Sequence, residues 1–265
     1  MHTLFISLHS EFYKSRKTLA FWAAILLPVI ICGLITFGFY SNSAEIIAAH
    51  NPPIMLWARY SGAALGIMGL LIMPFYVIFM AFSVNNIEHK NDTWKMLFAQ
   101  PLNKFAIYAA KYLFAVFLIF LCLFLFASLT FAFGHLLQLL VPKFNFDQYN
   151  PLHILINAYA KLFLSSLGIL SIQFILSLLW GDFLKPMGIG FVGTIMGIIA
   201  ANVGWKYAYL IPYSLPALVL RTSKVKKGGN PLDLPIFTQE IWTSLIYAAI
   251  LFIIGYFIVT KKSIK

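Results

Sequence analysis

Charged residues are scarce in this sequence: Asp, Glu, Lys and Arg together make up 10% of its 265 residues. Hydrophobic residues make up 61%, and the mean hydropathy is +0.86. Soluble globular domains carry about 25% charged residues, so this composition excludes that class and indicates a membrane protein. The only cysteines, Cys32 and Cys122, lie in apolar runs, where a thiol behaves as a small hydrophobe, and they predict no disulfide framework.

Acidic residues are the rarest charged type, with 8 Asp and Glu against 19 Lys and Arg, for a net charge of +11. In a soluble protein this excess would suggest nucleic acid. Basic residues beside membrane spans instead fix topology and contact anionic head groups, so we expect membrane lipids and no nucleic acid as partners. By our assignment no acidic residue lies deep in a span, which counts against a carrier driven by protons or sodium ions.

Catalytic motifs are missing as well. The sequence contains no GxxxxGK[ST] phosphate-binding loop, no HExxH pair and no GxSxG serine, and its six histidines show no metal-ligand spacing. We therefore expect no catalytic residue, no metal site and no cofactor on this chain. If the protein moves a substrate, the energy must come from a partner.

What the sequence has instead is six long apolar runs. They predict a single domain, residues 1–265, with an all-α membrane fold of six transmembrane helices. The runs lie at residues 19–40, 63–84, 112–140, 162–180, from 187 and at 242–259. In the fifth run Gly193 and Gly197 form a GxxxG pattern that permits tight helix contact, either within the chain or between chains.

Residues 1–18 precede the first run and have a helical amphipathic pattern. Leu4, Phe5, Leu8 and Phe12 recur at helical spacing, while the polar residues fall largely elsewhere. This pattern predicts an interfacial helix. A cleaved signal peptide is the alternative, but an apolar run of roughly 20 residues favours a retained span over a signal sequence of about 7 to 15.

Six spans place both termini on one side of the membrane, and we expect that side to be cytoplasmic. Of the 19 Lys and Arg, this assignment puts 11 inside and 8 outside. Five of the outer ones lie in residues 204–239, which opposes the assignment. That outer segment is also rich in proline and aromatic residues, which suggests backbone that lies at the interface or dips into it as a re-entrant segment.

One polar stretch, residues 88–101, interrupts the apolar sequence between the second and third runs. Residues 93–100 are good helix formers, Asn91 or Asp92 can act as an N-cap, and Pro101 ends the helix. Trp94, Leu97 and Phe98 share one face, which can fill a partner's groove. Glu88, Asp92 and Lys95 supply the polar side. The alternative is an ordinary amphipathic loop between two spans.

This stretch resembles the coupling helix of ABC-2 type permeases, the membrane subunits of a class of ABC transporters. The shared pattern is an acidic residue, then Trp-Lys-x-Leu-x-x-x-Pro, and a lysine that opens the third span; here these are Glu88, Trp94, Lys95, Leu97, Pro101 and Lys111. The whole length is similar to that family, and most similar to the lantibiotic (bacteriocin) self-protection permeases. The basic residues between 221 and 227 depart from the pattern.

The resemblance implies a type V exporter-like half-transporter in a bacterial inner (plasma) membrane. A second permease copy or a sister permease would complete the membrane part. Two ABC ATPase subunits would bind ATP and Mg and drive export of an amphipathic substrate such as a peptide antibiotic, a lipid or a drug. Two other classes remain open: a non-transporting anchor or assembly subunit of a surface or motility complex, and an ATP-independent carrier.

Overall fold

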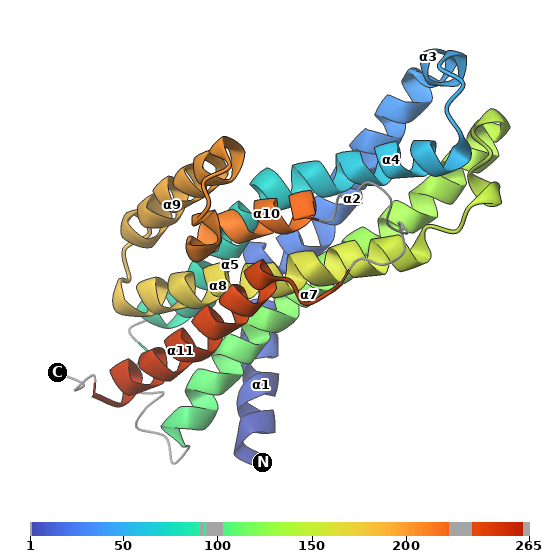
Figure 1. The fold of residues 1–265 in the computed structure, drawn as a ribbon. Helices are drawn as coiled ribbons and strands as arrows, with labels where there is room; N and C mark the ends of the chain where they lie inside the picture. The colour runs from blue at the N-terminus through green and yellow to red at the C-terminus, as the bar shows by residue number, and fades with distance from the viewer. Residues whose placement is uncertain (1, 91–92, 94–102, 223–234, 262–265) are drawn as a thin grey trace.

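Helices make up the architecture (Figure 1), in a computed structural model that describes residues 2–90, 93, 103–222 and 235–261. Within those residues six helices are long and apolar enough to cross a membrane. They are α2 (Leu19–Ser41), the continuous stretch from α4 (Pro53–Ile67) through η1 (Met68–Ile72) to α5 (Met73–Lys90), α7 (Lys104–Leu140), α8 (Leu152–Leu179), α9 (Leu184–Val203) and α11 (Gln239–Lys261). The sequence prediction of an all-α membrane fold with six spans is confirmed.

Several helices begin well before the apolar runs that revealed them. The second span starts at Pro53 rather than Ala63, the third at Lys104 rather than Tyr112, and the fourth at Leu152 rather than Leu162. Backbone capping explains these differences. Pro53 is suited to the first turn of a helix because its missing N–H needs no partner there, and Asn103 caps α7 by accepting the Phe105 N–H at 2.9 Å.

The second span changes its winding in the middle. Residues Met68–Ile72 form a π-helical turn directly before Pro74, which cannot donate a backbone hydrogen bond to the preceding turn. A Cβ on Gly69, inside this turn, would lie 2.2 Å from a methyl group of Leu220. The widened turn and the missing side chain together let α10 (Leu215–Thr222) approach the span closely.

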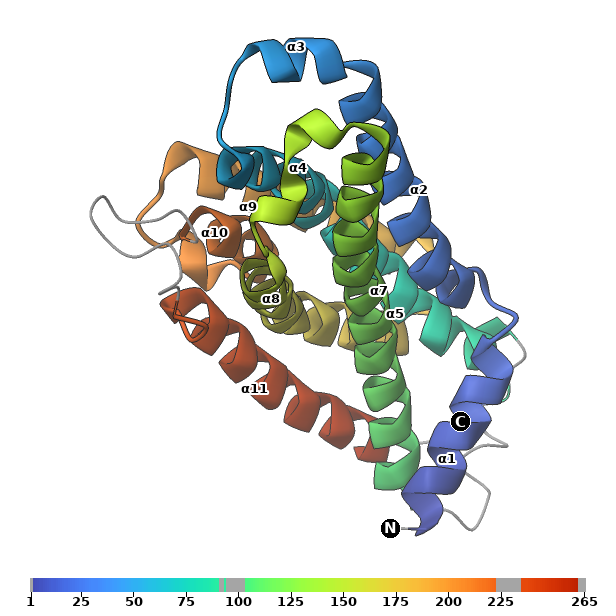
Figure 2. The same ribbon diagram turned by 90° about the vertical axis from the view of Figure 1, so that its right-hand side faces the viewer.

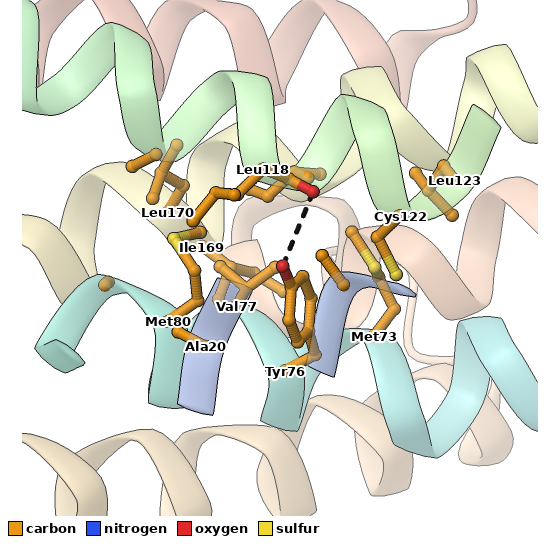
Figure 3. Close-up of a cluster of buried hydrophobic side chains, with 14 of the residues drawn as sticks. Ala20, Met73, Tyr76, Val77, Met80, Leu118, Cys122, Leu123, Ile169 and Leu170 are labelled. Atoms are coloured by element: carbon orange, nitrogen blue, oxygen red, sulfur yellow. Dashed lines mark hydrogen bonds between the residues drawn. The ribbon is translucent and has the colours of Figure 1, made fainter. Parts of the chain in front are cut away.

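The core lies where α2, α5, α7 and α8 meet (Figure 3). Met73, Val77 and Met80 of α5 are fully buried among side chains of the other three helices. Tyr76 also faces this cluster, and its hydroxyl donates to the carbonyl oxygen of Leu118 at 3.4 Å. Lipid is as apolar as these side chains, so their fit against one another, rather than escape from water, is what holds the helices together.

The two ends of the bundle differ (Figures 1 and 2). The α1 end carries α1 (His2–Ser15), the start of α7 and the last turn of α11. The α3 end carries α3 (Ser43–Ala48) and the two short turns η2 (Pro142–Phe144) and η3 (Phe146–Gln148). The first residue of α1, His2, and the last residue of α11, Lys261, therefore lie at the same end of the bundle. Large apolar side chains on α2, α9 and α11 face outward, as expected for lipid-facing helices.

After α9 the chain turns back along it. Gly204 ends the helix in the left-handed conformation, with φ of 72°, and η4 (Ala208–Leu210) and η5 (Pro212–Ser214) lead into α10. Gly193 and Gly197 lie against Tyr213: Cβ atoms on them would approach its ring to 2.7 Å and its carbonyl carbon to 2.6 Å. The surface of this GxxxG pattern is thus covered by the same chain.

Candidate functional site

The predicted coupling residues fall only in part within the described residues. Glu88 lies in the last turn of α5, and the backbone N–H of Thr93 donates to its carbonyl oxygen at 3.1 Å. Asp92, Trp94, Lys95, Leu97, Phe98 and Pro101 lie outside the described residues. The helix expected over residues 93–100 therefore stays a prediction, and the site is built from the two helix ends that flank it.

Helix α1 packs against the bundle through a polar face rather than an apolar one. The sequence suggested that Leu4, Phe5, Leu8 and Phe12 would form the membrane face, with polar residues elsewhere. Phe5 and Phe12 are indeed exposed. The polar stripe Ser7, Glu11 and Ser15, however, is buried against the bundle, where α1 packs on α7.

This inversion has a simple cause, because Glu11 meets charges of the opposite sign there. The Lys111 ammonium of α7 contacts Glu11 Oε2 at 2.9 Å and Glu88 Oε2 at 2.5 Å. Lys14 contacts the remaining oxygens, Glu11 Oε1 and Glu88 Oε1, each at 3.1 Å. The four residues form a closed ring of alternating charge, here called the charge ring, in which every carboxylate oxygen has an ammonium partner.

The charged groups of the charge ring are largely removed from water. Glu11, Glu88 and Lys111 are 3%, 1% and 1% exposed. Removing such ions from water costs several kcal/mol each, which only close, complete pairing can offset. Two carboxylates and two ammoniums give the charge ring no formal net charge, and Lys111 also donates to the Val84 carbonyl at 3.3 Å.

Lys14 is the member nearest to water, with 30% of its side chain exposed. Burial on its own would lower the pKa of the Lys14 ammonium, but attraction to Glu11 and Glu88 outweighs this and raises it above 10.5. Lys14 is therefore held in its charged form at neutral pH. Lys14 thus contributes a fixed positive charge to the charge ring.

The end of α5 is also fixed on another face. Asn85 donates to Ser177 Oγ at 2.8 Å and to the Phe174 carbonyl at 3.2 Å. One turn later, His89 Nε2 lies 3.1 Å from the Ser177 carbonyl oxygen. Helix α5 thus reaches residues 91–103 with its last turns bonded to α1 and α7 on one side and to α8 on the other.

The charge ring connects the two helices that flank residues 91–103 to the N-terminal helix. Glu88 stands just before residues 91–103 and Lys111 just after them, while Glu11 and Lys14 belong to the N-terminal helix. A displacement of that connection must therefore move α1, α5 and α7 together or break buried ion pairs. Such an arrangement can transmit a movement. Among the described residues, no group of three or more His, Cys, Asp or Glu is placed to hold a metal ion.

The comparison with known families decides which kind of protein this is. Residues 7–197 match the family described as ABC-2 family transporter protein, which is more than half of the 265 residues. The chain belongs to the ABC-2 transporter family. The matched range contains all four residues of the charge ring. This ABC-2 chain is accordingly a multi-pass membrane permease subunit. No curated protein sequence matches it.

Sequence reasoning found half of the charge ring. Glu88 and Lys111 were singled out through the resemblance, whereas Glu11 and Lys14 were only among the polar residues that fall largely outside the apolar pattern of residues 1–18. A signal was present: Ser7, Glu11, Lys14 and Ser15 form one continuous helical stripe of small and charged side chains. A stripe of that kind can pack against another helix as well as face water.

Proposed function

We propose that this ABC-2 permease subunit receives mechanical work from a separate ABC ATPase at residues 88–101 and uses it to export an amphipathic substrate. The charge ring is the observation that carries this proposal. It ties both helices flanking residues 91–103 to α1, so that a push on the connection reaches three elements at once. The ATPase would hold ATP and Mg, and this chain would supply no catalytic group.

The assembly follows from the same reasoning. One permease of six spans would form half of a transport pathway, completed by a second copy or a sister permease, with two ATPase subunits below. The exposed residues of α1, together with Trp94, Leu97 and Phe98, would form the ATPase interface. Both termini and residues 88–101 would then face the cytoplasm of a bacterial cell, across its inner membrane.

The apolar composition of the chain favours an amphipathic substrate. A pathway between helices of this composition suits molecules that already partition into the bilayer: an amphipathic peptide, a lipid or a drug. The Trp-Lys-x-Leu sequence at residues 94–97 favours peptide antibiotics, and hence self-protection against a bacteriocin. Export or expulsion from the bilayer would both serve that purpose.

The first experiment is purification of the native complex through a tag on this chain, with the partners identified by mass spectrometry. A stoichiometric P-loop ATPase supports the proposal. Its absence under conditions that keep the chain intact would overturn it and favour a membrane anchor or assembly subunit.

The second experiment separates coupling from folding. We expect Trp94→Ala to reduce ATPase association or substrate-stimulated ATP hydrolysis at least tenfold, since a buried Trp anchor contributes about 2 kcal/mol or more to an interface. Asp147→Asn, an exposed carboxylate in η3 at the α3 end, is the matched control and should leave both unchanged. Equal effects of the two variants would contradict a coupling role for residues 88–101.

A further inference from the structure

A pocket of about 420 Å³ lies between α2, α3 and α4, at the end of the bundle opposite the charge ring. This volume is within the range of small-molecule sites, about 300 to 1,000 Å³. Its position near the ends of two spanning helices places it at the level where a bilayer changes from hydrocarbon to head groups.

Part of the pocket wall is apolar. Ile35 and Phe39 contribute from one face of α2, and Ala63 contributes from α4. Ile35 precedes the end of α2 at Ser41 by six residues, or roughly 9 Å at 1.5 Å per residue. For a span that ends at the head groups, the apolar wall would extend from there roughly 9 Å into the hydrocarbon. Phe39 is held in place by edge contact with Tyr60, with ring centroids 5.2 Å apart.

Two opposite charges also line the pocket, one from each side. Glu45 comes from the first turn of α3 and Arg59 from α4, and both are exposed. Neither forms an ion pair or a side-chain hydrogen bond with another residue in the described parts of the chain. The charge ring contains four charges that satisfy one another, whereas this pocket presents one charge of each sign to whatever enters it.

We propose that this pocket binds a zwitterionic phospholipid whose head group carries a phosphate and a primary ammonium. The Arg59 guanidinium matches a phosphate because its planar N–H groups can donate two parallel hydrogen bonds. The Glu45 carboxylate accepts from the ammonium, and the first part of an acyl chain lies along Ile35, Phe39 and Ala63. An anionic head group without the ammonium would meet only repulsion at Glu45.

The lipid site does not depend on the proposed transport, because lipid binding can be measured on the full chain with or without an ATPase. The experiment is native mass spectrometry of the purified full-length protein in detergent. The probes are phosphatidylethanolamine, phosphatidylcholine and phosphatidylglycerol with identical acyl chains. We expect one saturable phosphatidylethanolamine adduct, weaker phosphatidylcholine binding because its quaternary ammonium donates no hydrogen bond, and the weakest binding of phosphatidylglycerol.

Variants assign the adduct to the pocket. Arg59→Gln should weaken phosphatidylethanolamine binding roughly tenfold, the cost of one charge-assisted hydrogen-bonded contact. Glu45→Gln should abolish the preference over phosphatidylglycerol, and Ala63→Phe should block the site by filling it without changing any charge. Lys143→Gln and Asp147→Asn, exposed charges at the same end of the bundle, are the controls.

A preference of the unaltered protein for phosphatidylglycerol would overturn the proposal without any variant. So would equal lipid binding by Arg59→Gln and Lys143→Gln, or an adduct that persists in Ala63→Phe. A non-saturable series of adducts shared by all three lipids would indicate only the surrounding lipid shell, and would also overturn it.

Discussion

The two ends of this bundle are held by different physical means. At the α1 end, three elements are joined by the buried charge ring of Glu11, Lys14, Glu88 and Lys111. At the α3 end, an aromatic cap of Trp57, Tyr60, Phe144 and Phe146 packs the connections together, with Trp57 stacked on Phe146 at 4.5 Å between centroids.

Ionic and aromatic contacts respond differently when the helices they join are displaced. Aromatic contacts depend on area and tolerate small shifts, whereas buried ion pairs lose their compensation for desolvation as soon as they separate. An end held by ions therefore has a well-defined closed arrangement and a steep cost of leaving it. That property suits the end where residues 88–101 would meet an ATPase, while the aromatic cap suits an anchor.

The largest test of this contrast is Lys111→Met, which leaves Glu11 and Glu88 buried with Lys14 as their one remaining ring partner. Breaking a buried pair from one side costs about 3 to 5 kcal/mol, so we expect a large fall in the temperature of unfolding. Thermal unfolding of the purified protein measures it. Lys143→Met, on an exposed lysine of η2, should change stability by no more than about 0.5 kcal/mol.

If Lys111→Met lowered the unfolding temperature no more than Lys143→Met does, the charge ring would not be what stabilises the α1 end. The double variant Glu88→Lys and Lys111→Glu offers a sharper check, because it reverses the pair between α5 and α7 and keeps the four positions at no formal net charge, but leaves Glu11 and Lys14 each beside one like charge. If ion pairing stabilises this end, the double variant should be more stable than either single variant and less stable than the native protein. If only volume matters, the two changes should add.

The aromatic cap should respond more mildly to a conservative change. Trp57→Phe keeps a stacked ring but removes the indole N–H that donates to the Phe146 carbonyl at 2.8 Å, and it leaves some space unfilled. Loss of a buried hydrogen bond and a small cavity costs about 1 to 3 kcal/mol. We expect a lower unfolding temperature. Substrate-stimulated ATP hydrolysis, measured per folded complex, should stay unchanged. A loss of this stimulation would contradict the proposed division of roles between the two ends.

Hydropathy was enough to predict the six spans, because a bilayer demands long apolar helices. It could not locate their ends. Pro53 and Asn103 begin helices through backbone chemistry that an apolar run does not report, and Arg59 consequently belongs to a helix although it precedes the apolar run at residues 63–84.

The sites were harder to predict for a related reason. Lys111 pairs with Glu11 across 100 positions of sequence, and no periodicity links them. The polar stripe of α1 was visible, but whether it faced water or protein depends on the opposite charges brought to it by α5 and α7. In the same way Glu45 and Arg59 line one pocket because α3 lies in the connection from α2 to α4, at the end of the bundle.

The smallest expected effect isolates Lys14, the ring member nearest to water. Its raised pKa means that its contribution to stability is complete below pH 10.5, the ordinary value, and disappears as pH rises through the higher value in the folded protein. The unfolding temperature of the native protein should therefore exceed that of Lys14→Met by an amount worth about 1 kcal/mol at neutral pH, and the gap should close above pH 10.5. The gap between native protein and Lys143→Met should stay near zero throughout. If the difference in unfolding temperature between the native protein and Lys14→Met persisted at high pH, the alkyl stem of Lys14, and not its charge, would be what stabilises α1. The contrast between an ionic end and an aromatic end would then rest on Lys111 alone.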